Sequence, residues 1–150
     1  MTLRVKTLAH QILIFAVLLM TAMPSPAQRT EMVIYGGPGH ETYLGCLTCI
    51  RFDPDSVCRS GGRYGSPLSP ESIWNSGGRY GGQFSPSSPW NRFAKHPPVV
   101  FDKAGNRYGR FWVNTPQRFR PDIRALLEHM SDPNDFDDAL VEARNRFCQH

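Results

Sequence analysis

Residues 52–99 read FDPDSVCRSGGRYGSP (52–67), LSPESIWNSGGRYGGQ (68–83) and FSPSSPWNRFAKHPPV (84–99), three consecutive copies of one 16-residue unit. The first two copies share the run SGGRYG, and the third diverges after its Trp-Asn pair. Two positions recur in all three copies; they hold Ser56, Ser72 and Ser88, and Cys58, Trp74 and Trp90. A fixed period indicates structural units that pack against one another rather than a catalytic site placed in a fold.

Each unit is expected to form turns and short extended pieces rather than a long helix or strand. Ser-Pro and Gly-Gly pairs recur in the units, and proline removes a backbone donor while Gly-Gly weakens helix and strand alike. We expect the Cys/Trp position to point inward, together with the opening Phe or Leu position (Phe52, Leu68 and Phe84). Tyr64 and Tyr80 are expected to pack between units. The recurring aromatic residues argue against low-complexity disorder, because disordered tracts are usually poor in them.

A segment on each side of the repeats predicts a β-hairpin. Residues 33–35 (VIY) and 42–49 (TYLGCLTC) are separated by GGPGHE, and residues 99–101 (VVF) and 107–114 (RYGRFWVN) are separated by DKAGN. β-Branched and aromatic runs separated by a few Gly, Pro, Asn and Asp residues are typical of hairpins. Gly45 and Gly109 occupy matching places in the second strands, where we expect bulges or close backbone approaches.

After Pro116 the pattern becomes helical. Pro121 and Asp122 suit the first turn of a helix, and its apolar face is formed by Ile123, Leu126, Leu127 and Met130. Residues 131–134 (SDPN) end this helix, and Asp132 or Asn134 is expected to cap the next one. The apolar stripe of that second helix is formed by Phe136, Leu140, Ala143 and Phe147. The predicted fold class is therefore mainly β with two C-terminal helices, a small α+β domain in which two β-hairpins bracket three turn-rich 16-residue repeats.

The first 27 residues have the pattern of a secretory signal peptide. Arg4 and Lys6 precede an apolar run at 12–20, and the small residues before position 28 suit cleavage after Ala27. The alternative is an uncleaved membrane anchor, but the run is short for a bilayer span. Residues 28–150 then form a single small exported domain, periplasmic or secreted, with no remaining membrane-spanning stretch. This domain retains 15 of the 17 basic residues against 13 acidic ones, too small an excess to indicate nucleic-acid binding.

Four cysteines, Cys46, Cys49, Cys58 and Cys148, remain in the exported domain. An even number in a small exported domain favours two structural disulfides, and three connectivities are open. Residues three apart on a strand point to opposite faces, so we expect Cys58 to pair with one member of the C-x-x-C pair and Cys148 with the other. The alternatives are a redox-active C-x-x-C motif and a metal site, the latter formed by Cys46, Cys49 and Cys58 with His40, His96 or Cys148.

Outside the cysteines, the sequence lacks a catalytic signature. The run GGPGHE at 36–41 matches neither the P-loop nor the dinucleotide fingerprint, and no Gly-x-Ser-x-Gly, His-Glu-x-x-His or calcium-loop pattern occurs. His40 and Glu41 are adjacent, so on a strand they would face opposite ways. We therefore expect a protein that is not an enzyme and that uses no cofactor.

Arginine–tyrosine pairs and tryptophans raise the alternative of a binding edge. On one exposed face they would stack on sugars or bases, with arginine supplying charge. The residues of this edge are Arg63, Tyr64, Trp74, Arg79, Tyr80, Trp90, Arg107 and Tyr108. The interpretation that we favour is that tyrosine and tryptophan form the small core, because the chain has few Leu, Ile and Val residues.

Several motifs in the same order resemble a family of small exported bacterial proteins of no established function, rich in Tyr-Gly, Ser-Pro and Asn repeats. The motifs are YGGPG (35–39), YLGCLTC (43–49), the RYG and SPESIWN units, and PPVV (97–100). The resemblance covers roughly residues 33–114. It implies an accessory role, because similar repeats lie beside enzymatic domains in some envelope-associated or secreted proteins. It brings no catalytic or binding residues, and this chain departs from it by using Cys58 and tryptophan where related repeats often have polar residues.

Three hypotheses about function follow. The first is a non-enzymatic exported protein, structural or binding, of the bacterial cell envelope, with an envelope component or polysaccharide as its partner. The second is a zinc-binding or thiol-redox protein built on the C-x-x-C-x8-C cluster. The third is a polysaccharide- or nucleic-acid-binding module that uses the Arg-Tyr repeats, of which we disfavour the nucleic acid.

Overall fold

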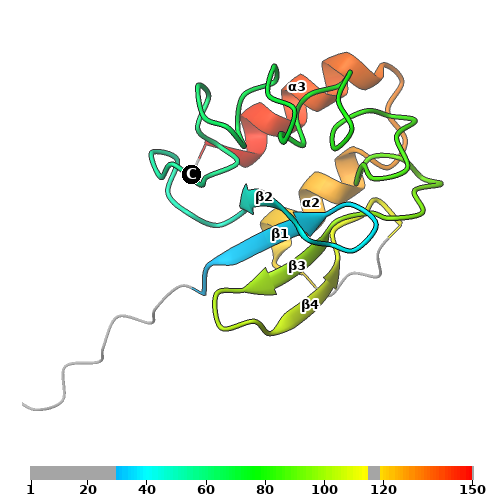
Figure 1. Ribbon diagram of the computed structural model, residues 1–150. Coiled ribbons are helices and arrows are strands. Elements are labelled where there is room, and N and C mark those ends of the chain that lie inside the picture. Colours follow the sequence, from blue (N-terminus) through cyan, green and yellow to red (C-terminus); the bar gives the residue numbers. More distant parts are fainter. Residues whose placement is uncertain (1–29, 115–118, 150) are drawn as a thin grey trace, which may run out of the picture.

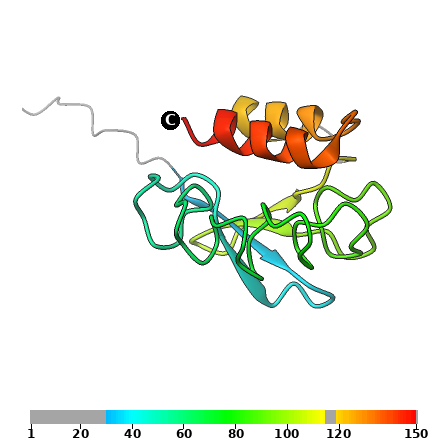
Figure 2. The same ribbon diagram turned by 90° about the horizontal axis from the view of Figure 1, so that it is seen from above.

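The computed structural model describes residues 30–114 and 119–149, and the predicted signal peptide at 1–27 lies outside them. Figures 1 and 2 show two layers, a sheet bordered by the turns of the repeats and a pair of helices on one side of it. The elements follow the order β1 (Met32–Gly36), β2 (Thr42–Cys46), β3 (Val99–Asp102), β4 (Arg107–Arg110), α2 (Pro121–His129) and α3 (Phe136–Phe147). The predicted fold class, mainly β with two C-terminal helices, is confirmed. In the part of the chain that the structure describes, no helix is long and apolar enough to cross a membrane.

Both predicted hairpins form, and they join into one sheet of order β2-β1-β3-β4 in which every strand pair is antiparallel. Ile34 of β1 lies opposite Val100 of β3 at the centre of the sheet. Each of these residues has a glycine as its partner on the other side, Gly45 for Ile34 and Gly109 for Val100. The two hairpins are thus related by an approximate twofold axis between Ile34 and Val100.

Gly45 and Gly109 mark β-bulges, as the sequence predicts. The strand register shifts beside each glycine, and φ is +111° at Gly45 and +135° at Gly109. Residues with a side chain rarely adopt this region, which explains the two glycines. At Gly45 a Cβ atom would also lie 2.9 Å from the Asp55 carbonyl oxygen, because the first repeat unit passes along the β2 edge. That edge is occupied by hydrogen bonds between the Cys46 backbone and the backbone of Asp55 and Val57.

The repeats form a continuous series of linked turns. In the second unit the backbone N–H groups of Ser69, Ser72, Asn75 and Gly78 each donate to the carbonyl oxygen three residues earlier, and Gly82 donates to Gly78, four residues earlier. Four steps of three residues and one step of four make up the 16-residue period, and the same steps recur in the first unit. Ser, Pro, Gly and Asn are the residues that favour such turns.

The recurring serine (Ser56, Ser72 and Ser88) is buried in all three units. Each hydroxyl oxygen accepts the backbone N–H two residues later, at 3.1 to 3.2 Å. A buried hydroxyl without such a partner is destabilising. The recurrence of serine therefore has a local structural cause.

The tryptophan position links each unit to the one before it. The indole Nε1–H of Trp74 donates to the Val57 carbonyl oxygen at 2.7 Å, and that of Trp90 donates to the Ile73 carbonyl oxygen at 2.6 Å. The two rings stack with centroids 5.7 Å apart and are almost fully buried. The expectation that this position points inward is confirmed, and Cys58, partly buried against the core, holds the same place in the first unit.

The expectation that the opening Phe or Leu position points inward is wrong. Phe52, Leu68 and Phe84 are 76%, 88% and 86% exposed. Each is the third residue of a turn whose tip faces solvent, such as the turn from Ser66 to Ser69. The turn that carries Trp74 has the same apolar character but directs its tip at the core. The hydrophobicity of the turn residue therefore does not predict its burial. The winding of the chain decides which turns point toward the helices and which point toward solvent.

α3 packs against the column of tryptophans. The Phe147 ring centroid lies 6.4 Å from that of Trp74. The Arg144 guanidinium donates to the Gly65 carbonyl oxygen at 3.1 Å and to the Ser60 hydroxyl at 3.2 Å. α2 lies beside α3, and the predicted inward faces are confirmed; the buried residues are Ile123, Leu126, Leu127, Met130, Leu140 and Ala143.

The expected cap of the second helix is wrong. Neither Asp132 nor Asn134 caps α3; Asp135, in an extended conformation directly before Phe136, accepts the Asp138 N–H at 3.0 Å. An N-cap needs a side-chain oxygen directly before the helix and a free backbone N–H two or three residues later, which Asp135 and Asp138 supply. Aspartates in the first turn also suit the positive end of the helix dipole.

Replacing Trp90 with phenylalanine is expected to lower the free energy of unfolding by about 1–3 kcal/mol, because the buried Ile73 carbonyl oxygen loses its donor. The matched control is Trp112→Phe, which removes the bond to the Asn91 carbonyl oxygen (2.7 Å) at a half-buried ring that water reaches. Equilibrium urea unfolding measures both variants. A loss for Trp90→Phe no greater than for Trp112→Phe would contradict a special role for the buried indole bond.

The packing of the turns predicts a contrast between two glycines of the first unit. A Cβ atom at Gly65 would lie 2.3 Å from the Arg59 carbonyl oxygen, whereas one at Gly61 would have no heavy atom within 4 Å. Gly65→Ala should therefore lower stability by about 1–3 kcal/mol, since only a backbone shift relieves the clash, and Gly61→Ala should be neutral. Thermal unfolding compares the two, and equal melting temperatures would show that the turn is not tightly packed.

Candidate functional site

The two faces of the sheet differ in what covers them. Ile34, Leu44 and Val100 belong to the main core beneath the helices and the repeats. Because successive side chains alternate across a strand, Tyr35 and Phe101 point to the opposite face. Both helices lie on the core side in Figure 2, so this second face is not covered by them. We call it the open face.

Aromatic side chains gather on the open face. The Tyr35 ring makes edge contacts with Tyr43 and Phe101, with centroids 5.3 and 5.8 Å apart. Tyr64, from the first repeat unit, meets Tyr43 at 5.1 Å with perpendicular planes. Edge-to-face contacts of this kind hold the rings in fixed orientations. The cluster combines strands β1, β2 and β3 with the repeats.

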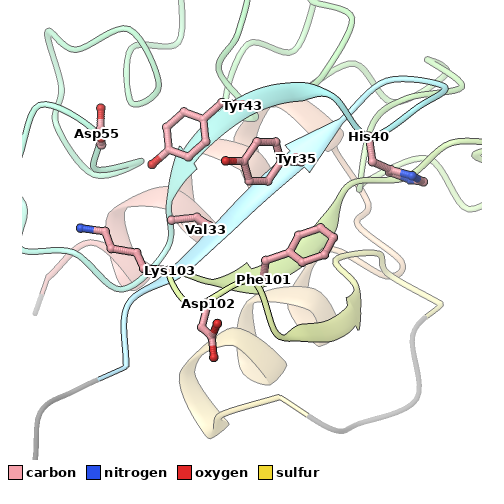
Figure 3. Close-up of a pocket in the computed structure, with 9 residues that line it drawn as sticks. Val33, Tyr35, His40, Tyr43, Asp55, Phe101, Asp102 and Lys103 are labelled. Carbon is pink, nitrogen blue, oxygen red and sulfur yellow. The ribbon is translucent and has the colours of Figure 1, made fainter.

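A hollow of about 550 Å³ opens on this cluster, and we call it the open-face pocket. Figure 3 shows Tyr35, Tyr43 and Phe101 standing on the strands that form its floor. His40 lies at one end of the pocket, and Asp55 and Lys103 lie at the other. The pocket thus offers apolar ring surface between polar groups, which is the usual composition of a ligand site.

The charged groups around the pocket are held by neighbours. Lys103 forms an ion pair with Glu31, and this hydrogen bond raises the pKa of Lys103. The Asp102 carboxylate accepts the side-chain amide and the backbone N–H of Asn106, each at 2.8 Å, which lowers the pKa of Asp102. Figure 3 shows the Asp102 carboxylate directed away from the Tyr35, Tyr43 and Phe101 rings, so the Lys103 ammonium and the Asp55 carboxylate are the charged groups that border the pocket.

Tyr43 is a hydrogen-bonding group rather than a nucleophile. Burial raises the pKa of its hydroxyl well above the ordinary range for tyrosine, and the negative charge of Asp55 raises it further. The hydroxyl stays protonated at every physiological pH, and it can donate to or accept from a polar ligand.

His40 fixes the turn of the first hairpin. It has φ of +53°, and its ring Nε2–H donates to the Pro97 carbonyl oxygen at 3.1 Å. The bond ties the hairpin turn to the segment that enters β3. Glu41, beside it, is exposed, and the two residues do not line the pocket together.

The expected disulfide pairing is wrong, although all four cysteines are paired. Cys46 bonds Cys49, and Cys58 bonds Cys148. β2 ends at Cys46, so Cys49 does not follow the alternation of a strand. The chain bends back instead, the Cys49 N–H donates to Cys46 Sγ at 3.0 Å, and the two Cα atoms lie 5.5 Å apart, within disulfide range.

The cysteines do not form the metal site that their spacing allows. Every described cysteine sulfur is engaged in a disulfide, and Cys58 pairs away from the C-x-x-C segment. Glu31 is the described acidic group that lies near both Cys46 and Cys49, with the ligand atoms within 4.8 Å of one another. A carboxylate at this distance disfavours a thiolate, which is the opposite of the surroundings of reactive cysteines.

The residues of the predicted Arg-Tyr edge do not share one face. Trp74, Trp90 and Tyr80 are buried in the core, so the edge is wrong for these three and the core interpretation is confirmed for them. Arg63 and Arg79 lie over the rings of the tyrosines that follow them, with guanidinium-to-centroid distances of 5.7 and 5.6 Å. Arg107 and Tyr108 lie apart on β4. Of the eight residues, Tyr64 reaches the open face through its contact with Tyr43.

The residues that build the open-face pocket, above all Tyr35, Tyr43 and Phe101, were not candidates from the sequence. The sequence pattern does not identify them as surface residues, because residues 32–35 (MVIY) are all apolar. A strand with no polar residue at alternate positions is predicted to be buried on both faces, so its pattern does not show which face is open.

No protein-family model, curated protein or solved structure matches this chain. The resemblance to small exported repeat proteins therefore stays a prediction.

The two disulfides should differ in their contribution to stability. Cys58–Cys148 joins residues 90 apart in sequence, and Cys46–Cys49 joins residues 3 apart. In the chain-entropy model, replacing Cys58 and Cys148 by alanine lowers the free energy of unfolding by about 4–5 kcal/mol. Replacing Cys46 and Cys49 lowers it by about 2 kcal/mol. Urea unfolding of the two double variants tests this. A larger loss for the Cys46/Cys49 variant would mean that the packing of the fully buried Cys46 side chain, not loop closure, dominates.

Proposed function

We propose that this protein is a non-enzymatic exported binding protein of the bacterial cell envelope, periplasmic or secreted, whose open-face pocket holds a saccharide unit of an envelope polysaccharide. The observation that carries the proposal is the aromatic floor of the pocket on the uncovered face of the sheet. We also propose that the chain belongs to the family of small exported repeat proteins that its motifs resemble.

A saccharide suits the pocket because a sugar ring has an apolar C–H face and a rim of hydroxyl groups. Tyr35 and Phe101 offer ring surface for the first, and Asp55, Lys103 and the Tyr43 hydroxyl offer acceptors and donors for the second. The rings are pre-oriented by their mutual edge contacts, which lowers the entropy lost on binding.

A nucleic acid suits the pocket less well. Phosphate groups require an excess of cationic side chains, but Lys103 is paired with Glu31, and Asp55 also lines the hollow. The Asp55 carboxylate would repel a phosphate backbone.

Export is supported by the disulfides. Two disulfides in a chain of this size favour an oxidising compartment, because disulfides rarely persist in a reducing cytosol.

The proposal is tested by titrating the chain from Gln28 onward with N-acetylglucosamine oligomers and with soluble cell-wall fragments, following NMR shifts of the tyrosine and phenylalanine rings. We expect shifts at Tyr35, Tyr43 and Phe101. Phe101→Leu, which keeps an apolar side chain but removes the ring, should weaken binding by about tenfold, a loss of about 1.4 kcal/mol.

The matched control is Phe93→Leu, the same change at a ring that is 88% exposed and outside the pocket. It should bind like the unmodified chain. Binding that Phe101→Leu leaves intact, or shifts confined to other rings, would exclude the open-face pocket as the saccharide site.

A further inference from the structure

Large apolar side chains are exposed along the repeats to an unusual extent. Seven of the described residues are exposed large hydrophobics, and five of these lie between positions 50 and 93. Single exposed apolar residues are common on protein surfaces. Here, however, three of them, Phe52, Leu68 and Phe84, occupy the same position of the 16-residue unit and are at least three-quarters exposed. We call these three residues the apolar ridge.

Each ridge residue holds the third position of an equivalent turn, closed by the backbone bonds from Asp53 to Ile50, from Ser69 to Ser66 and from Ser85 to Gly82. The indole bonds of Trp74 and Trp90 reach equivalent carbonyl oxygens of the preceding units. The amides of Asn75 and Asn91 also bond equivalent carbonyl oxygens, at 3.1 and 2.9 Å. Because these contacts repeat, successive units are related by nearly the same displacement. The same displacement therefore relates the ridge residues, which open the units.

The turn segment that carries the ridge is basic. Residues 50–96 contain six arginines or lysines, all exposed, against three acidic residues; the basic residues are Arg51, Arg59, Arg63, Arg79, Arg92 and Lys95. The Arg51 guanidinium lies over the Phe52 ring, 5.4 Å from its centroid.

The three acidic residues of the segment offset part of this positive charge. Asp53 accepts the Asp55 N–H, Asp55 lines the open-face pocket, and Glu71 is paired with Arg63. The segment therefore keeps a net positive charge, although Arg63 is paired with Glu71 and Arg92 with Asp132. The exception is the far end of the ridge. There Phe84 shares a hollow with Asp135 and Asp137 of the α3 start.

We propose that the apolar ridge docks the protein on the surface of an anionic phospholipid bilayer. Phe52 and Leu68 enter the interface between headgroups and acyl chains, and the surrounding arginines contact the lipid phosphates. Interfacial binding needs both an apolar area and a positive flank, which this edge combines.

The geometry favours a bilayer over a protein partner. The ridge side chains stand singly on turn tips, and a protein partner would need a series of pockets at matching spacing. A bilayer accepts protruding side chains at any spacing, because its interface is fluid. The inference is independent of the saccharide proposal, since the ridge shares no residue with the open-face pocket.

The test is co-sedimentation with vesicles that contain phosphatidylglycerol, compared with vesicles of phosphatidylcholine alone. The chain used begins at Gln28, so that the apolar run at 12–20 contributes nothing to binding. We expect binding to the anionic vesicles that weakens with salt. The triple variant Phe52→Ser, Leu68→Ser, Phe84→Ser should bind at least about tenfold more weakly, because transfer of apolar side chains drives the docking.

Two controls separate this effect from others. Val141→Ser removes an apolar side chain of α3 that is 60% exposed but lies outside the ridge, and it should bind like the unmodified chain. Phe101→Leu should also keep vesicle binding, which separates the ridge from the open-face pocket. Because all three ridge positions are solvent-exposed, the triple variant should retain its melting temperature and both disulfides.

Three results would overturn the proposal. These are no binding to anionic vesicles at low salt, equal binding by the triple variant, and equal binding to both vesicle types. A chain that self-associates through the ridge, as shown by a dimer that the triple variant abolishes and that does not bind vesicles, would assign the ridge to a second copy instead.

Discussion

The hydrogen bond from each tryptophan indole to a main-chain carbonyl oxygen of the preceding unit is the contact on which the rest of the structure depends. Units made of turns have no strand or helix ladder to hold them in register, so their spacing is set by side chains. Trp74 and Trp90 supply both the buried area and the directional bond, and they stack on one another. α3 rests on the same column, through the Phe147 ring and through the Cys58–Cys148 disulfide at the equivalent position of the first unit.

This arrangement also decides where a ligand can bind. The two helices lie on one side of the sheet, the repeats border it from the β2 edge, and the side chains of Ile34, Leu44 and Val100 are committed to the core that they share. The opposite face is left with the aromatic side chains of the same strands. Tyr64, carried by the first repeat unit along the β2 edge, extends the cluster. The candidate site thus follows from the placement of the core.

The sequence predicted local structure correctly at positions where a residue type strongly favours one conformation. Glycines at positive φ marked the bulges at Gly45 and Gly109, Pro121 marked the start of α2, and apolar spacing marked the helix faces. Two expectations failed for a shared reason. The pairing of Cys46 with Cys49 and the capping of α3 by Asp135 both depend on where a short segment turns by one or two residues. Composition does not resolve such shifts.

By itself the sequence determined the period of the repeats, their construction from turns, the two hairpins, the two helices and the inward tryptophans, because each of these rests on the preferences of a few adjacent residues. Only the tertiary structure decided which turn tips meet the helices and which face solvent, which cysteines approach one another, and which side of the all-apolar strands stays open. The physical reason is that Leu68 and Trp74 are equally apolar turn residues, and their burial differs because the units wind against α3 on one side alone.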